Sequence, residues 1–310
     1  MTATIPPSGP GLVFERVSKW YGVIAALTDV SFSVGCEVVG LVGKNGVGKS
    51  TLLRLAAGLA RPSEGSVRVG GHRTTSLAGH AQLGFCPDTE RLFEAFDAVT
   101  FVAWMLRYHG LDRRSALARS EEVLTELGLG AAMRRPVREY SKGMRQRVRL
   151  AQALAHRPKF LLLDEPMNGL DPVARRDLSE HIRSLPARGV GVLLSSHVLH
   201  ELEAVTDRVV LVHQGRLVAE GTVGDLRAKM PTRPHRLRIV VSNPRDLATR
   251  LVQWDGVVSV QLMANSVELA VVGEAFYARL TELGATWPQG FCAVEPLDDD
   301  LASVFGYLVR

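Results

Sequence analysis

The stretch Gly43-Lys44-Asn45-Gly46-Val47-Gly48-Lys49-Ser50-Thr51 decides the fold of this chain. It fits the pattern of a glycine, four residues and then Gly-Lys-Ser/Thr, which is typical of phosphate-binding loops. The glycines admit positive φ and close approach to a phosphate, and the backbone N–H groups form an anion-binding nest. In this pattern Lys49 reaches the β- and γ-phosphates, and the Ser50 hydroxyl can bind Mg²⁺. A glycine turn that binds nothing is the less favoured alternative.

The segments on either side of the loop supply the context that such a loop requires. The apolar run at 38–42 predicts a buried strand that enters the loop. The segment at 52–59 predicts a helix that leaves it, with the positive end of the helix toward the phosphates. The sequence therefore predicts an α/β nucleotide-binding domain.

The composition predicts a globular protein of two domains. The chain has 310 residues, 46% hydrophobic and 22% charged. No apolar run approaches the roughly 20 residues of a membrane helix, and the first residues lack an apolar signal core, so we expect a cytosolic protein. Three widely spaced cysteines argue against a disulfide framework or a zinc site. The net charge of +5 leaves open a nucleic acid partner, an anionic membrane leaflet or no partner at all.

Two acids end a strongly apolar strand. Asp164 and Glu165 follow the run at 160–163, and carboxylates at the end of a buried strand are costly unless they are paired or bind a metal. Asp164 suits Mg²⁺ coordination, and Glu165 suits activation of a water molecule. The alternative is an acid pair that caps the next helix.

Three further positions are candidate site residues. Ser141 is a plausible N-cap, so a hydroxyl and a helix N-terminus meet there at a point suited to phosphate. His197 follows the strand expected at 190–194, at the sheet edge where ligands bind. The ring of Tyr21 can stack on a base or pack beside a strand.

The C-terminal part has its own pattern. Beyond a linker at 231–234, strands and helices alternate in the order β-α-β-β-α-β, which predicts a ferredoxin-like fold. The expected domains are an ATP-binding domain at 1–230, with a helical insertion at about 88–155, and a small α+β domain at 235–310. A last helix is expected at 297–308.

The motifs together resemble the ATP-binding subunits of ABC transporters over residues 12–225. The loop at 43–51 resembles Walker A, and Asp164 with Glu165 resembles Walker B and its catalytic glutamate. The other matching positions are the signature Ser141-Lys142-Gly143-Met144, the D-loop Asp171, the switch His197, the adenine-stacking Tyr21 and Asp88.

This sequence departs from the family pattern at two motifs. The signature has Lys142 and Met144 in place of Gly and Gln, although its serine hydroxyl and backbone N–H groups remain. Asp88 stands where the family has the Gln that touches Mg²⁺, and it is one methylene shorter and charged. Both a metal role and a partner contact are open for Asp88. The run Ser-Lys-Gly-Met-Arg-Gln-Arg resembles the branch of ABC-2-type exporters.

The resemblance implies a mechanism and partners. Two copies form a head-to-tail homodimer in which each ATP, with Mg²⁺, lies between one Walker loop and the other copy's Ser141. A separate membrane permease carries the substrate, so the subunit is peripheral on the cytoplasmic face of the membrane, and no nucleic acid partner is expected. The alternatives are a soluble ABC-type ATPase in translation or DNA repair, and a P-loop kinase.

A loop rich in apolar residues predicts the permease contact. Leu92, Phe93 and Phe96 follow Pro87 in a segment expected at the surface, where apolar patches commonly mark interaction sites. We expect these side chains to contact a cytoplasmic helix of the permease, because the equivalent loop of the family docks there. Phe101 is expected to fold back onto the helical insertion.

Overall fold

A computed structural model describes residues 11–89, 92–228, 234–273, 275–288, 290–298 and 303. The chain divides into two compact units, Met1–Glu220 and Gly221–Arg310, which is earlier than the predicted boundary at 230–235. Residues 231–233 of the predicted linker and nearly all of the helix predicted at 297–308 lie outside the described residues.

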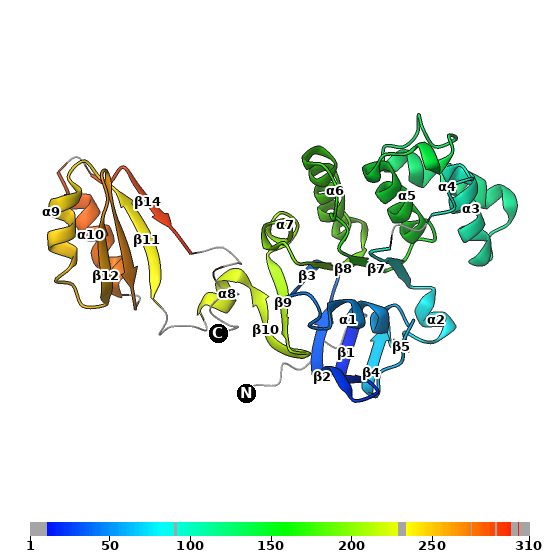
Figure 1. The fold of residues 1–310 in the computed structure, drawn as a ribbon, viewed down its shortest axis with the longest axis horizontal. Coiled ribbons are helices and arrows are strands. Elements are labelled where there is room, and N and C mark those ends of the chain that lie inside the picture. The colour runs from blue at the N-terminus through cyan, green and yellow to red at the C-terminus, as the bar shows by residue number, and fades with distance from the viewer. Residues whose placement is uncertain are drawn as a thin grey trace. The chain divides into compact units, whose positions relative to one another are not determined.

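A six-stranded sheet forms the centre of the first unit (Figure 1). Its strands lie in the order β10 (Arg216–Thr222), β9 (Arg208–His213), β3 (Val38–Val42), β8 (Gly191–Ser196), β7 (Phe160–Asp164) and β6 (Leu83–Cys86). The pairs from β9 to β6 are all parallel. Every residue of β3, β7 and β8 is buried, which explains why these strands are continuous apolar runs.

A second, antiparallel sheet lies on the other side of helix α1 (Lys49–Ala56). Its order is β2 (Ile24–Val34), β1 (Leu12–Tyr21), β4 (Glu64–Val69) and β5 (His72–Arg73). Leu52, Leu53 and Leu55 of α1 are fully buried in one core with side chains of both sheets. This packing fixes the start of α1 against the end of β3, where the phosphate-binding loop lies.

The segment between β6 and β7 is mostly helical, as predicted. It contains α3 (Ala98–Tyr108), α4 (Arg113–Glu126), a short 3₁₀ turn η1 (Val137–Glu139) and α5 (Lys142–Leu154). The sequence over about 99–127 has a helical pattern, and the structure divides this stretch into two helices. The chain turns at Gly110, whose φ of +89° stops α3, and the Asp112 carboxylate then accepts from Arg114 N and Ser115 N to start α4.

The remaining elements of the first unit cover the six-stranded sheet and its edge. They are α2 (Leu77–His80), α6 (Pro172–Ser184), a 3₁₀ turn η2 (Pro186–Arg188) and α7 (Leu199–Glu203). Both long helices near the site start with a side-chain cap, since Ser141 Oγ accepts from Met144 N and Asp171 Oδ1 accepts from Ala174 N. Among the described residues, no helix is both long and apolar enough to cross a membrane.

The second unit begins with α8 (Val223–Ala228) and continues with a four-stranded antiparallel sheet. Its elements are β11 (His235–Val240), α9 (Pro244–Leu251), β12 (Val257–Leu262), β13 (Ser266–Val271), α10 (Ala275–Thr286) and β14 (Ala293–Pro296). The strand order is β12-β13-β11-β14. Alternate residues of β11 and β13 form one core with α9 and α10, including Ile239, Val267, Leu247 and Phe276. The opposite sheet face carries the charged side chains Arg238 and Glu268.

Candidate nucleotide-binding and hydrolysis site

The loop between β3 and α1 is shaped by two glycines with positive φ, Gly46 at +81° and Gly48 at +112°. A Cβ on Gly48 would lie 2.7 Å from Leu27 Cδ2 and 2.8 Å from Ala26 O, so no other residue fits there. No side chain caps the start of α1. The first N–H groups of α1 are therefore available to a bound anion.

Lys49 lies under this loop and is almost completely buried, at 6% exposure. Its Nζ donates to the carbonyl oxygen of Gly43 at 2.7 Å and lies 3.7 Å from Glu165 Oε1. These contacts hold the ammonium group next to the phosphate-binding loop, on the side that faces Asp164 and Glu165 at the end of β7. A buried ammonium group needs such partners, and a phosphate is a further one.

Asp164, the last residue of β7, is buried and accepts two hydrogen bonds at Oδ1. Ser195 Oγ donates at 2.7 Å and Ser50 Oγ at 3.3 Å. Ser195 Oγ also accepts from Glu165 N at 3.1 Å, so one hydroxyl from β8 fixes both acids. From the sequence, Ser195 is only a residue that follows the strand expected at 190–194. Its role could have been inferred because this strand was expected to end at the same sheet edge as the two acids.

Glu165 has a φ of +49°, a backbone conformation that costs a residue other than glycine on the order of 1 kcal/mol. Its Oε2 accepts from His197 N at 3.2 Å and lies 2.8 Å from His197 Nδ1. The carboxylate is thus held between Lys49 and His197. The bond that Glu165 N donates to Ser195 Oγ and the bond that His197 N donates to Glu165 Oε2 maintain this conformation, which turns the carboxylate toward the loop.

A cavity of about 390 Å³ joins these groups. Its walls combine the phosphate-binding loop and the start of α1 with two acids, the histidine, one residue of β2 and one residue of the turn after β7. The lining residues are Ala26, Asn45, Gly46, Gly48, Lys49, Ser50, Thr51, Asp88, Glu165, Asn168 and His197. The structure thereby brings together nine of the predicted site residues, which are all of the lining residues except Ala26 and Asn168. Asn168 is an addition that the sequence placed only in a turn.

The oxygen atoms beside the loop match the preferences of Mg²⁺. Ser50 Oγ and Asp164 Oδ1 are hard ligands, and they lie 3.3 Å apart. The described residues contain no cluster of three or more His, Cys, Asp or Glu side chains that could hold a metal alone. Mg²⁺ is commonly held by one or two carboxylates together with substrate phosphates and water.

The thiol of Cys86 lies between β6 and the helical region. It accepts a hydrogen bond from Gln146 Nε2 of α5 at 3.7 Å. Burial raises the pKa of Cys86, which keeps the thiol neutral. Because Cys86 ends β6 two residues before Asp88, this contact ties α5 to the loop that carries Asp88 into the cavity.

Other predicted residues do not line this cavity. Tyr21 is 47% exposed at the β1–β2 turn, and Lys19 Nζ lies 5.0 Å from its ring centroid. Ser141 and Lys142 are exposed at the start of α5, and Asp171 is exposed at the start of α6. A Cβ on Gly143 would lie 3.1 Å from Ala174 Cβ, so this glycine also permits close approach of α5 and α6.

The glycine loop leads from β3 into α1, and the two acids end β7, which is separated from β3 by β8 alone. With the buried lysine, this arrangement is that of a P-loop nucleotide hydrolase. The family model described as "ABC transporter" matches residues 27–168. The chain belongs to the family of ABC transporter ATP-binding proteins.

Relatives from bacteria cover most of the chain. It is 35% identical to the uncharacterized ABC transporter ATP-binding protein YxlF of Bacillus subtilis (strain 168), over 74% of this chain and 76% of that protein. It is 38% identical to Nod factor export ATP-binding protein I of Burkholderia orbicola (strain AU 1054), over 67% of this chain and 69% of that protein. A solved structure, "Structure of ATP binding subunit of ABC transporter", aligns with a TM-score of 0.65 at 32% identity, over 71% of this chain and 93% of that chain.

These findings identify an ATP-binding subunit that hydrolyses ATP to drive transport through a membrane partner. They favour this function over the alternative of an ABC-type ATPase in translation or DNA repair.

Proposed function

We propose that this subunit powers export through a separate permease. The name of the Burkholderia relative includes export, and the signature of this chain has the Ser-Lys-Gly-Met form. The observation that carries the catalytic part of the proposal is that Lys49 and His197 both contact Glu165 at the same cavity. Hydrolysis at this cavity supplies the energy for transport.

Each site residue has a distinct role in this proposal. The loop N–H groups and Lys49 bind the β- and γ-phosphates, and Ser50 and Asp164 hold Mg²⁺, which when bound offsets the charge of the phosphates. Glu165 accepts a proton from the attacking water. His197 orients the Glu165 carboxylate and contacts the γ-phosphate, while Asp88 lies at the rim as a metal ligand or a partner contact.

The site is completed by a second copy of the chain. Ser141 is exposed and outside the cavity, although its hydroxyl and the N-terminus of α5 are suited to bind phosphate. A homodimer in which α5 of one copy faces the loop of the other brings these groups to the γ-phosphate. Tyr21, exposed on its turn, is then free to stack on adenine.

Mixing two inactive variants tests this arrangement. Lys49→Ala chains mixed with Ser141→Arg chains form dimers in which one composite site carries both lesions and the other carries none. Part of the ATPase activity should return on mixing if Ser141 acts across the interface. If each site is built within one chain, mixing gives no rescue. The absence of rescue would also follow if both sites must hydrolyse ATP together, and nucleotide trapping by the mixture distinguishes these two cases.

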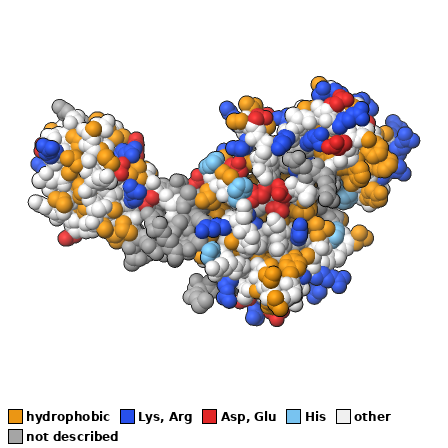
Figure 2. Space-filling view, viewed as in Figure 1, with side chains coloured by type: hydrophobic (Ala, Val, Ile, Leu, Met, Phe, Trp, Pro, Cys, Tyr) orange, Lys and Arg blue, Asp and Glu red, His pale blue; other side chains and the backbone are white. Residues whose placement is uncertain are grey.

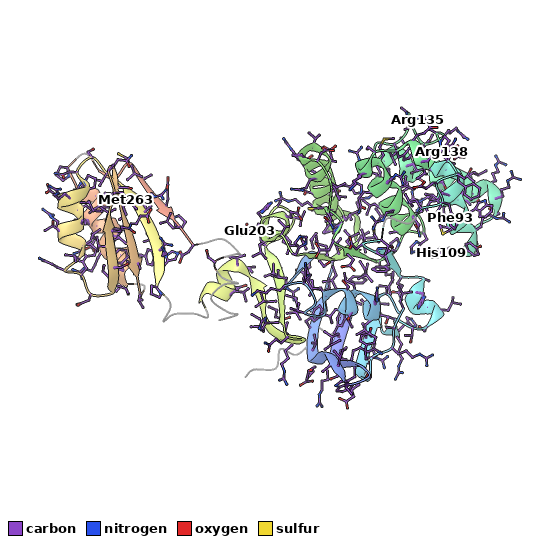
Figure 3. All side chains as sticks on the ribbon, in the orientation of Figure 1. Phe93, His109, Arg135, Arg138, Glu203 and Met263 are labelled. Carbon is purple, nitrogen blue, oxygen red and sulfur yellow. The ribbon has the colours of Figure 1, made fainter. Side chains whose placement is uncertain are left out.

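The permease contact is the aromatic surface formed by Leu92, Phe93, Phe96 and Trp104. Phe93 is 60% exposed, while Phe101 is buried as predicted. The ring centroid of Phe96 lies 6.2 Å from that of Phe93 and 5.2 Å from that of Trp104, so the rings of the loop adjoin α3. Figure 3 shows Phe93 beside α3. Apolar surfaces of this kind commonly mark protein contacts.

Phe93→Asp tests the docking function of this surface. We expect the variant to bind ATP and to keep its melting temperature, yet to lose co-purification with the permease. Leu59→Asp is a matched control at 65% exposure, and Phe101→Asp should instead lower the melting temperature sharply because it buries an unpaired charge. A sharp drop for Phe93→Asp would contradict the docking assignment.

The second unit is proposed to be a ferredoxin-like accessory domain at 235–310. Its order β-α-β-β-α-β and its strand order, with the first strand between the third and the fourth, support this assignment. We place the whole subunit at the cytoplasmic face of the membrane as a peripheral protein, because its proposed partner is a permease.

A further inference from the structure

The end of the α3–α4 hairpin exposes two aromatic rings that no described element covers. Tyr108 is 83% exposed and Trp104 is 50% exposed. Their spacing of four residues places both rings on one face of α3. Rings with an apolar body and a polar tip are favoured at the boundary between lipid and water.

Three arginines belong to the same end of the hairpin. Arg107 lies on the same face of α3, and Arg113 and Arg114 begin α4 across a turn of four residues. All three side chains are exposed, and none of them forms an ion pair with another described residue. Asp112 is the acid of this turn, and its carboxylate is engaged at the start of α4.

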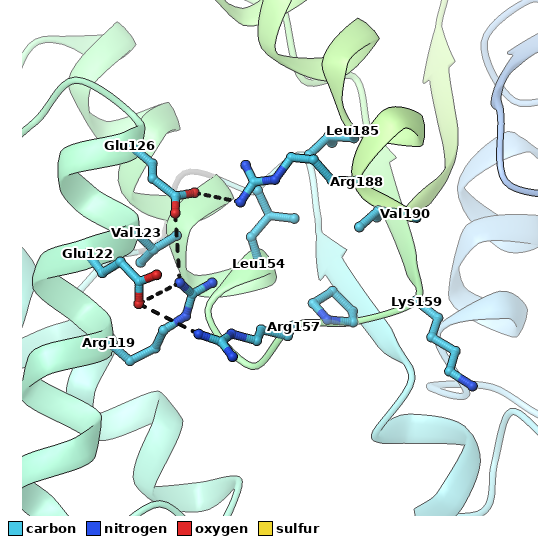
Figure 4. A pocket seen from close by; sticks show the side chains of 12 residues that line it. Arg119, Glu122, Val123, Glu126, Leu154, Arg157, Lys159, Leu185, Arg188 and Val190 are labelled. Atoms are coloured by element: carbon cyan, nitrogen blue, oxygen red, sulfur yellow. Dashed lines mark hydrogen bonds and ion pairs between the residues drawn. The ribbon is translucent and has the colours of Figure 1, made fainter.

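This corner carries a net positive charge. Three arginines against one aspartate give a formal charge of +2 over residues 104–114. The acids of α4 beyond the turn are instead paired, as Glu122 is with Arg119 (Figure 4). Figure 2 shows hydrophobic side chains beside Lys and Arg where α3 and α4 lie.

We propose that this corner, defined by Trp104, Arg107, Tyr108, Arg113 and Arg114, contacts the anionic headgroups of the membrane surface. Guanidinium groups attract anionic lipid, and the two rings enter the interface beside them. The proposal deepens the peripheral location proposed above. Trp104 belongs both to this corner and to the aromatic surface proposed for permease docking, so lipid contact and permease docking would orient the subunit in the same way.

Anionic lipid suits this corner better than a nucleic acid or an acidic peptide does. The arginines lie at a turn between two helices, and no described pocket is lined by them, whereas single-stranded nucleic acid is held in grooves that follow its backbone. An anionic membrane surface needs no such groove, because exposed arginines and rings at a protruding turn are enough to contact it. One such contact is weak by itself and reversible, as suits a subunit that also binds a permease.

Vesicle sedimentation of the full chain without a permease tests the proposal independently of transport. The chain should bind phosphatidylcholine vesicles that contain phosphatidylglycerol, and high salt should release it. Each arginine near the surface contributes roughly fivefold, so the triple change Arg107→Gln, Arg113→Gln and Arg114→Gln should lower the partition coefficient about 100-fold. ATP binding by this variant should stay unchanged.

The matched control removes three other exposed arginines, Arg61, Arg183 and Arg216, by the same change to Gln. Both triple variants reduce the net charge from +5 to +2, so only position differs. Brominated lipid should quench the emission of Trp104, as judged against Trp104→Phe. Equal losses in the two triple variants, binding to neutral vesicles or an unquenched Trp104 would overturn the proposal. Retained vesicle binding with lost permease co-purification would assign the arginines to the permease and also overturn it.

Discussion

Glu165 combines a strained backbone with two polar neighbours, Lys49 at 3.7 Å and His197 at 2.8 Å. Such strain persists only where the surroundings maintain it, and it is concentrated at functional sites. The bond from Ser195 Oγ to Asp164 and the bond from Glu165 N to Ser195 Oγ provide this support. The position of one carboxylate therefore depends on residues from β7, β8 and the loop before α1.

Glu165→Gln should separate nucleotide binding from hydrolysis. The amide keeps the shape and a hydrogen-bonding oxygen but cannot accept the proton, so turnover should fall roughly 10²–10⁴-fold while ATP affinity remains. Steady-state phosphate release and an ATP titration measure the two quantities. Lys49→Ala is the contrasting variant, since it removes a phosphate contact and should weaken binding itself. Near-normal turnover of Glu165→Gln would show that another group acts as the base.

The residues closest to the phosphates were the most predictable from sequence. Lys49, Ser50 and Asp164 lie in motifs whose spacing alone defines a geometry, and the structure places them together. Ser195 was not predicted as functional, because a serine at a strand end has no distinctive pattern. Its role arises only from the pairing of β7 with β8.

At the scale of elements, the hydrophobic pattern predicted the strands and the buried helices. It did not predict where the helical region divides into α3 and α4. The pattern over 99–127 continues through the turn at Gly110, so sequence periodicity could not show where α3 ends. In the structure the end of α3 contacts the end of α5 through the stacked rings of His109 and His156, whose centroids are 4.1 Å apart. This stack joins two helices of the helical region next to β6.

The stack predicts a dependence of stability on pH. Burial, with a smaller effect of His109, lowers the pKa of His156 from 6.5 to about 4. The unfolded chain therefore binds more protons between these values, and the free energy of unfolding falls as the pH falls through this range. The contribution of His156 to that free energy should be about 2 kcal/mol lower at pH 5 than at pH 7.

Urea unfolding of His156→Gln at both pH values measures this effect. Gln keeps a donor for Leu83 O, which lies 3.0 Å from His156 Nε2, but it does not titrate. The difference in stability between pH 5 and pH 7 should therefore shrink by about 2 kcal/mol relative to the unchanged chain. His72→Gln is the control, since His72 is exposed. An equal pH dependence in all three proteins would contradict the assignment.

At the scale of the whole molecule, every described residue that lines the nucleotide cavity belongs to the unit Met1–Glu220. The second unit has a separate core built from β11, β13, α9 and α10. The sequence predicted both parts, because its pattern repeats the alternation of strand and helix after residue 235. The structure divides the two units between Glu220 and Gly221, before the expected end of the first domain at 230.

Truncation after Glu220 should therefore leave ATP binding intact. We expect the shortened chain to bind ATP with an affinity within about twofold of the full chain, which is less than 0.5 kcal/mol. A chain ending at Met230, the predicted boundary, is the control for damage to β10, which ends at Thr222. Loss of ATP binding in both chains would show that the second unit contributes to the site.

The central claim is that ATP joins two copies through Lys49 of one and Ser141 of the other. Light scattering of Glu165→Gln with ATP and Mg²⁺ tests it most directly, because this variant should hold ATP without hydrolysing it. The account predicts twice the chain mass of 33.8 kDa with ATP, and the single mass without ATP or when Ser141→Arg is added. A single mass in the presence of saturating ATP, or a dimer that Ser141→Arg leaves intact, would contradict the account.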